Sequence, residues 1–362
     1  MTKVSVIIPV YNVEKYIERN LESLLNQTLD DIEIIYINDC STDESLSILK
    51  RYEKKYENIT VIDLEKNSGA AVARNKGLEI AKGEYIGFVD PDDDVDLNYY
   101  EELYKKAKAE NADIVKCKRK NINLDGQITY NNINDVIKEK GKYYFTYEWT
   151  TAIYKSSLIF DNDIRFPEEC IKAQDIVFLN RVICVSNKVC LIDNVYYNYY
   201  KRQGSLNSSK ISLPKIKSAI LAHKLILDNY NNSDLYETNK SLYFELYLRM
   251  YNSLLDNVPF QNDEKEAKIL CAKALIENFY NCKDIELFKQ NYPLKNIFKF
   301  IEEKDTNGLA EVLYKNQSMK KLSIYGEPLI DKVFSIKESH DKKHKILKIF
   351  GIKMTLKNKE RK

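Results

Sequence analysis

The segment YIGFVDPDDD, residues 85–94, joins a short apolar run to four aspartates within five positions. Carboxylates this close together repel one another and raise each other's pKa unless a cation neutralises them. Mg²⁺ and Mn²⁺ prefer oxygen ligands, and they commonly take one or two from protein carboxylates and the rest from phosphate and water. The segment therefore predicts a buried strand that ends at a divalent-metal site for a nucleotide diphosphate. The alternative is a solvated turn, since runs of charge usually lie on the surface.

Three further apolar runs precede this segment, at residues 4–10, 32–37 and 59–62. Runs that are apolar throughout are typical of parallel strands that helices cover on both faces. The segments between them repeat apolar residues at helical spacing, and Ser41 followed by Glu44 predicts a capping box for the second helix. The chain is therefore expected to form an α/β fold, an open and mostly parallel sheet flanked by helices.

Polar residues follow each of these runs. Ligands of open α/β sheets bind beyond the carboxyl ends of the strands, so these residues are expected to meet at one crevice. The sets are Tyr11-Asn12, residues 39–43, residues 67–69 and residues 90–94. Asp39 could accept from the ring N–H of a pyrimidine or cap a helix. Gly69 opens a helix whose N–H groups, with Arg74, could face phosphate, although Arg74 could equally be a surface or ion-pair residue.

Four blocks of sequence point to a known family. They are VSVIIPVYN (4–12), NDCSTD (38–43), NSGAAVARNKG (67–77) and FVDPDD (88–93). Their order and spacing resemble the family 2 glycosyltransferases of the GT-A fold, of the kind that builds bacterial surface glycans. The resemblance is strong over residues 1–120 and weaker over 145–210. It implies transfer of a sugar from a nucleotide diphosphate, expected to be UDP, to an acceptor hydroxyl, with inversion at the anomeric carbon.

The resemblance also assigns the donor site. The residues expected to bind the nucleotide sugar are Pro9, Tyr11, Asn12, Asp39, Gly69, Arg74, Asp90 and Arg202. Asp90-Pro91-Asp92 matches the family's Asp-x-Asp motif, in which Asp92 is expected to bind Mg²⁺ or Mn²⁺ directly and Asp90 to lie beside the ribose and the metal. Asp93 is expected to support them. Such a cation stabilises the charge on the departing nucleoside diphosphate.

An inverting transfer needs a base that removes the proton of the acceptor hydroxyl. The family places this base in a Glu-Asp pair at the head of a helix, which here reads Gln174-Asp175, so Asp175 is the expected base. An aspartate that merely favours the first turn of a helix is the alternative. Gln174 removes a carboxylate from the acceptor side. Trp149, where the family has an acceptor-side helix, could stack on a sugar or pack in the core.

Length and composition bound the domains and the location. The 362 residues are 44% hydrophobic, with a formal net charge of +2 and seven scattered cysteines, which predicts two domains, no nucleic-acid partner and a reducing, cytoplasmic location. We divide the chain into a catalytic domain (1–210), an all-helical accessory region (211–336) and a basic amphipathic tail (337–362). The tail could contact anionic lipid at the inner face of the cytoplasmic membrane or be a solvated end.

Two other classes of function compete with a transferase that acts on a glycan or a lipid-linked acceptor. A nicotinamide-dependent oxidoreductase would need a Gly-x-Gly-x-x-Gly turn after the first strand, and residues 9–12 lack it. A non-catalytic sugar-nucleotide-binding module, or a scaffold of a glycan-assembly complex, stays open because of Gln174. The sequence leaves the oligomeric state open.

Overall fold

The computed structural model describes residues 1–130, 148–202, 212–238, 240, 247, 264–286, 295–315, 334–338, 344–349 and 352–357. The chain divides into two compact units, Met1–Tyr314 and Lys315–Lys362. The predicted boundaries at residues 210 and 336 stay predictions.

The first half of the main sheet is parallel. Its strands lie in the order β3 (Ile59–Asp63), β2 (Ile32–Asn38), β1 (Val4–Val10) and β4 (Tyr85–Phe88). β1 is buried along its whole length because helices cover both faces of the sheet. Val10 pairs with Asn38, so β1 and β2 end side by side. The α/β fold class is confirmed, and this parallel half brings the polar strand ends together.

The second half of the sheet is mixed. β8 (Ala152–Lys155) runs antiparallel to β4 and to β6 (Ile114–Ile122), whereas β9 (Val189–Tyr200) runs parallel to β6. β7 (Ile128–Tyr130) pairs with β6 and β5 (Asp94–Val95) pairs with β9, both antiparallel. The sheet is therefore less parallel than the sequence predicted. β5 begins inside the acidic segment and joins it to β9.

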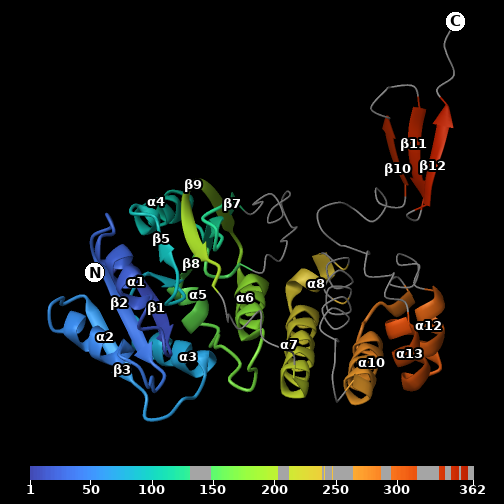
Figure 1. Ribbon diagram of the computed structural model, residues 1–362, viewed down its shortest axis with the longest axis horizontal. Coiled ribbons are helices and arrows are strands. Elements are labelled where there is room, and N and C mark those ends of the chain that lie inside the picture. The colour runs from blue at the N-terminus through green and yellow to red at the C-terminus, as the bar shows by residue number, and fades with distance from the viewer. Residues whose placement is uncertain are drawn as a thin grey trace, which may run out of the picture. The chain divides into compact units, whose positions relative to one another are not determined.

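Helices form a layer on each face of the sheet (Figure 1). One layer contains α1 (Ile17–Leu25), α2 (Ser45–Glu53) and α4 (Tyr99–Glu110), and the other contains α3 (Ala70–Ile80), α5 (Ser156–Phe160) and α6 (Gln174–Val185). Ile7 packs in the core beneath α3, while Val6 and Ile8 pack in the core beneath α1. This alternation follows from the two-residue period of a strand.

The predicted capping box at Ser41 and Glu44 is wrong. α2 begins at Ser45, and Glu44 makes no side-chain hydrogen bond that caps it. The Ser41 hydroxyl instead accepts the backbone N–H of Asn12, from the loop after β1. The Ser41 hydroxyl, which the local pattern assigned to the cap of α2, therefore makes a tertiary hydrogen bond instead.

The region after β9 is helical only in part. α7 (Leu213–Asn231) packs against α6 and α10 (Glu264–Tyr280), and α8 (Asp234–Thr238), α12 (Lys295–Glu302) and α13 (Thr306–Lys315) belong to the same stretch. Among the described helices, none is both long enough and apolar enough to cross a membrane.

The last unit contains an antiparallel sheet of β10 (Phe334–Glu338), β11 (His344–Ile349) and β12 (Ile352–Lys357). β10 begins at Phe334, so the last three residues of the region predicted to be all-helical, 334–336, lie in a strand. Alternate residues of a strand lie on opposite faces, so the interleaved lysines and apolar residues of the predicted tail have the period of a strand. Membrane contact of this unit stays a prediction.

Candidate functional site

The loops after β1 and β2 are held together by hydrogen bonds around Asn12. Its backbone N–H donates to Ser41 Oγ at 3.1 Å, and its Oδ1 accepts the backbone N–H of Thr42 at 2.8 Å. Asn12 has a positive φ of 51°, a conformation that asparagine tolerates better than most residues. The adjacent Tyr11 is 48% exposed, so a ring face is open to a ligand, whereas Pro9 is buried within β1.

Asp39 links the loop after β2 to the loop before α3. Its Oδ1 accepts the N–H of Ser68 at 2.6 Å and its Oδ2 accepts the N–H of Gly69 at 2.8 Å. Gly69 has a φ of 90°, which L residues with a side chain rarely adopt, and α3 begins directly after it. Asp39 thus holds the start of α3, and its remaining lone pairs could still accept a base N–H.

Arg74, in the second turn of α3, pairs with the acidic segment. Its Nη2 lies 3.0 Å from Asp90 Oδ1, and the arginine side chain is 7% exposed, against 35% for the aspartate. Its buried Nε has no hydrogen-bond partner among the described residues. A buried guanidinium group with an unused donor is well suited to an anionic ligand such as phosphate.

Trp149 belongs to the core rather than to an open sugar-binding face. It is 4% exposed and its ring packs against Phe88, Phe166 and Phe178, with the ring centroids of Phe88 and Trp149 4.9 Å apart. The guanidinium carbon of Arg74 lies 4.5 Å from the Trp149 ring centroid. Of the two alternatives for Trp149, packing in the core fits this structure: the aromatic neighbours cover the ring, and its cation–π contact supports Arg74.

Two of the four carboxylates in the acidic segment, those of Asp93 and Asp94, accept hydrogen bonds from β9. Asp93 accepts from the Tyr197 hydroxyl at 2.8 Å and from the Tyr200 N–H at 2.9 Å. Burial raises the pKa of Asp93 well above its usual value, and the neighbouring carboxylates raise it further. Asp93 therefore fits its predicted supporting role, since its oxygens are engaged by β9.

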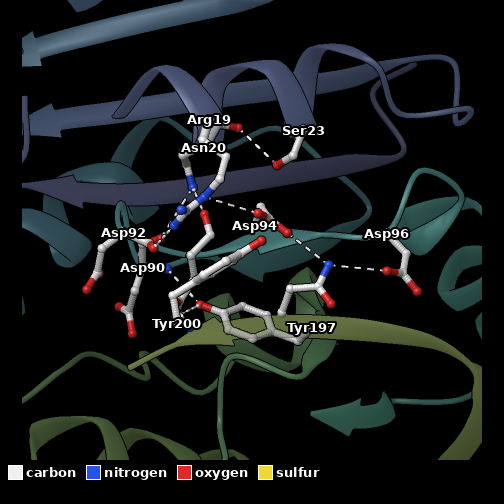
Figure 2. A network of polar contacts seen from close by, with 11 residues as sticks. Arg19, Asn20, Ser23, Asp90, Asp92, Asp94, Asp96, Tyr197 and Tyr200 are labelled. Atoms are coloured by element: carbon white, nitrogen blue, oxygen red, sulfur yellow. Dashed lines mark hydrogen bonds and ion pairs between the residues drawn. The ribbon is translucent and has the colours of Figure 1, made fainter. Parts of the chain in front are cut away.

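Arg19 braces the same turn from α1 (Figure 2). Its Nε lies 3.2 Å from Asp94 Oδ2, and its Nη2 donates to the carbonyl of Asp92. The guanidinium carbon lies 3.6 Å from the centroid of the Tyr200 ring. Asp94 also accepts from Asn198 Nδ2 at 2.8 Å, so this carboxylate is structural too.

Asn20, next to Arg19, is fully buried and holds the backbone of the turn. Its Nδ2 donates to the carbonyls of Asp93 at 2.9 Å and Asp90 at 3.3 Å, and its Oδ1 accepts from the Tyr36 hydroxyl. Sequence reasoning missed Arg19, Asn20 and the tyrosine hydroxyls of β9. The available signal was a polar residue inside the apolar stripe of α1, where burial demands a hydrogen-bond partner.

Asp90 and Asp92 are the other two aspartates of the segment, and theirs are the carboxylates that a ligand could use. Asp92 Oδ2 lies 2.6 Å from Arg202 Nε. Burial raises the pKa of Asp92 and the Asp90 carboxylate raises it further, while Arg202 opposes both. The described residues contain no cluster of three or more metal-binding side chains. Two carboxylates nevertheless fit Mg²⁺ or Mn²⁺, which take their other ligands from diphosphate and water.

Asp175 lies in the first turn of α6, directly after Gln174 and after Ala173, whose φ is 63°. Burial raises the pKa of Asp175, the nearby Arg74 lowers it, and Asp90 raises it. Asp175 is therefore close to the guanidinium group that pairs with Asp90. A raised pKa suits a carboxylate that must accept a proton. Gln174 is partly exposed beside it.

The open sheet with helices on both faces, and the acidic segment beyond the end of β4, give the chain a fold of the GT-A type. Residues 5–173 match the model of glycosyl transferase family 2. The chain is 33% identical over 269 residues to the cholesterol galactosyltransferase of Borreliella burgdorferi, covering 69% of this chain and 73% of that protein. This chain belongs to glycosyl transferase family 2.

Two other relatives are named for poly(ribitol-phosphate). The poly(ribitol-phosphate) beta-glucosyltransferase of Bacillus spizizenii is 34% identical over 331 residues, covering 88% of this chain and 51% of the relative. TarS of Staphylococcus aureus, a poly(ribitol-phosphate) beta-N-acetylglucosaminyltransferase, is 33% identical over 260 residues, covering 70% and 45%. The chain thus spans about half the length of these two relatives.

A solved structure gives the same fold. The crystal structure of TarS residues 1–349 with UDP-GlcNAc has a TM-score of 0.72 and 23% identity, and covers 99% of this chain and 100% of that one.

Proposed function

We propose that this protein is an inverting glycosyltransferase that moves a hexosyl or N-acetylhexosaminyl group from a UDP-sugar to a hydroxyl of a glycan or lipid-linked acceptor. The donor proposal is supported by TarS, which was crystallised with UDP-GlcNAc. The acceptor proposal is supported by the relatives named for poly(ribitol-phosphate), a surface polymer. The proposed place of the reaction is synthesis of a surface polysaccharide on the cytoplasmic side.

The observation that carries the proposal is the ion pair of Arg74 with Asp90, because the charge of Arg74 also acts on Asp175. Arg74 Nη2 lies 3.0 Å from Asp90 Oδ1. A group that stabilises the leaving diphosphate and a base for the acceptor must both lie within a few ångströms of one anomeric carbon. A shared arginine supports such an arrangement.

Each part of the site then has a task. Tyr11 and Asp39 bind the uracil and ribose, while Arg74 and Arg202 bind the diphosphate. A divalent cation held by Asp90 and Asp92 would neutralise negative charge on the leaving group. Asp175 takes the acceptor proton as the acceptor oxygen bonds to the anomeric carbon, and the bond to the β-phosphate oxygen breaks with its electron pair leaving on UDP.

A screen of UDP-sugars with Mn²⁺ tests the donor proposal. A bound donor at 100 times its dissociation constant should stabilise the protein by about 2.7 kcal/mol in a thermal-shift assay. Asp92→Asn should abolish this shift, and so should EDTA with the unaltered protein. A full shift in the presence of EDTA would contradict the metal assignment and leave the UDP-sugar assignment standing.

Asp175→Asn tests the base. Donor binding should persist while transfer falls by roughly 10²- to 10⁴-fold, the usual contribution of a general base. Asp163→Asn is the matched control, because the Asp163 side chain is 88% exposed and pairs only with Arg165 among the ion pairs of the described residues. Near-normal transfer by Asp175→Asn would move the base elsewhere. Donor binding by the unaltered protein with neither transfer nor hydrolysis would favour a binding module.

A further inference from the structure

Arg202 forms an ion pair with Asp92, the carboxylate that the proposed function assigns to a metal. It lies two residues beyond the end of β9, and its Nε is 2.6 Å from Asp92 Oδ2. The two side chains are 30% and 16% exposed, so this ion pair is partly shielded from water. The guanidinium carbon also lies 5.3 Å from the centroid of the Tyr16 ring.

The other arginines of the site do not serve this carboxylate. Arg19 contacts the backbone carbonyl of Asp92 and pairs its charge with Asp94, while Arg74 pairs with Asp90. Within the described part of the chain, Arg202 is therefore the one cationic side chain in an ion pair with Asp92. An oxygen so close to a guanidinium nitrogen cannot also bind Mg²⁺ at about 2.1 Å without strong repulsion between the two cations.

We propose that Arg202 is an internal counter-cation: it competes with a divalent cation for Asp92 and, once released, binds the donor's diphosphate. The inference rests on the proposed function and goes beyond it, because it gives one side chain opposite effects on two ligands. Arg202 weakens binding of the metal alone and strengthens binding of the nucleotide. The metal and the nucleotide are therefore coupled, and each raises the affinity for the other by the same factor.

Charge and geometry favour this exchange over a permanent ion pair. A guanidinium group binds carboxylate and phosphate through the same fork of donors, so a diphosphate can replace Asp92 as its partner. Asp92 is next to Asp90, so when Arg202 leaves, the two carboxylates need a new cation. Transfer of Arg202 to the diphosphate and binding of the metal at Asp92 each leave charge unbalanced when they occur alone, so neither is favourable without the other.

The first measurement is a titration with Mn²⁺ alone, in which electron paramagnetic resonance of the free ion gives the affinity for the metal. The second is calorimetry of UDP binding with and without Mn²⁺. Arg202→Gln removes the charge and leaves a shorter, uncharged polar side chain. This variant should bind Mn²⁺ alone at least fivefold more tightly than the unaltered protein, at the lower end of the usual 5- to 150-fold range for coupled sites. It should bind UDP more weakly, and Mn²⁺ should improve its UDP binding less.

Two further variants complete the test. Arg51→Gln removes an arginine whose side chain is 64% exposed and pairs with Glu18, and it should leave both affinities unchanged. Arg202→Lys keeps the charge and should give values between those of the unaltered protein and Arg202→Gln. Arg202→Gln could bind Mn²⁺ no more tightly than the unaltered protein, while Mn²⁺ still promotes UDP binding in the unaltered protein. That result would overturn the competition between Arg202 and the metal for Asp92 and leave the metal site standing. UDP binding that ignores Mn²⁺ in every protein overturns the metal site together with the competition.

Discussion

The hydroxyl of Tyr197 is a strong test of how the acidic turn is held. It accepts the backbone N–H of Asp90 at 3.0 Å and donates to Asp93 Oδ2 at 2.8 Å. Tyr197 is 1% exposed, and burial raises its pKa, so the hydroxyl keeps the proton that it donates. Tyr197→Phe removes one oxygen atom and leaves both partners buried.

The expected loss of stability is larger than for an ordinary buried tyrosine. The Asp90 N–H and the Asp93 carboxyl group each lose a buried hydrogen-bond partner, and such a loss costs about 1–3 kcal/mol per group. Tyr197→Phe should therefore lower the free energy of unfolding by about 3–5 kcal/mol. The matched control is Tyr85→Phe, since the buried Tyr85 hydroxyl donates to a neutral acceptor, the carbonyl of Ala112, at 2.9 Å. That change should cost about 0.5–1.5 kcal/mol.

Urea unfolding measures both losses, and calorimetry of UDP with Mn²⁺ measures the effect on the site. Tyr197→Phe should weaken UDP binding because the backbone of Asp90 is no longer fixed, whereas Tyr85→Phe should leave it unchanged. Equal losses of stability in the two variants would refute the idea that the Tyr197 hydroxyl is the partner of two buried groups. Unchanged UDP binding by Tyr197→Phe would refute its link to the site.

Two further predictions concern backbone strain and a buried charge. Gly69 has a φ of 90° and Gly126 a φ of 80°, and a Cβ added at either position would meet no atom within 4 Å. Gly69→Ala and Gly126→Ala should therefore each lower the free energy of unfolding in urea by about 1–3 kcal/mol through backbone strain alone. Only Gly69→Ala should also weaken UDP binding. Burial lowers the pKa of Lys116 from 10.5 to about 8, so between these values the unfolded chain holds a proton that the folded protein has released. Lys116 alone should therefore add on the order of 3 kcal/mol of stability as pH rises over that range, and Lys116→Met should remove this contribution, which makes the slope of stability against pH less positive; equal slopes for the two proteins would contradict the shift.

Much of the fold could be predicted because the information is local. A continuous apolar run such as residues 4–10 predicts a strand covered on both faces, and the structure contains that strand from Val4 to Val10. The rule that ligands bind at strand ends brought Asp39, Gly69 and Asp90 to one edge, and their hydrogen bonds confirm that the loops meet. Their roles in binding a nucleotide sugar stay predictions.

The division of labour within residues 90–94 could not be predicted. All four aspartates share a sequence environment, but Asp93 and Asp94 are engaged by residues of β9 about a hundred positions later. The same limit explains Ser41, whose partner lies in another loop, and Trp149, whose ring is covered by aromatic residues from three other segments. Local pattern reveals a side chain's chemistry, whereas its partner depends on the tertiary fold.

The charge balance of the turn explains why a donor would need a metal. The four carboxylates of residues 90–94 are met by the guanidinium groups of Arg19, Arg74 and Arg202, which leaves one formal negative charge. A nucleotide diphosphate is itself negative, so its approach to this turn alone is opposed. A divalent cation reverses the sign of the turn and makes the same approach favourable. Asp94 then has a second consequence beyond its hydrogen bond to β9: its charge holds Arg19 beside the turn, whereas Arg74 and Arg202 are held by Asp90 and Asp92 themselves.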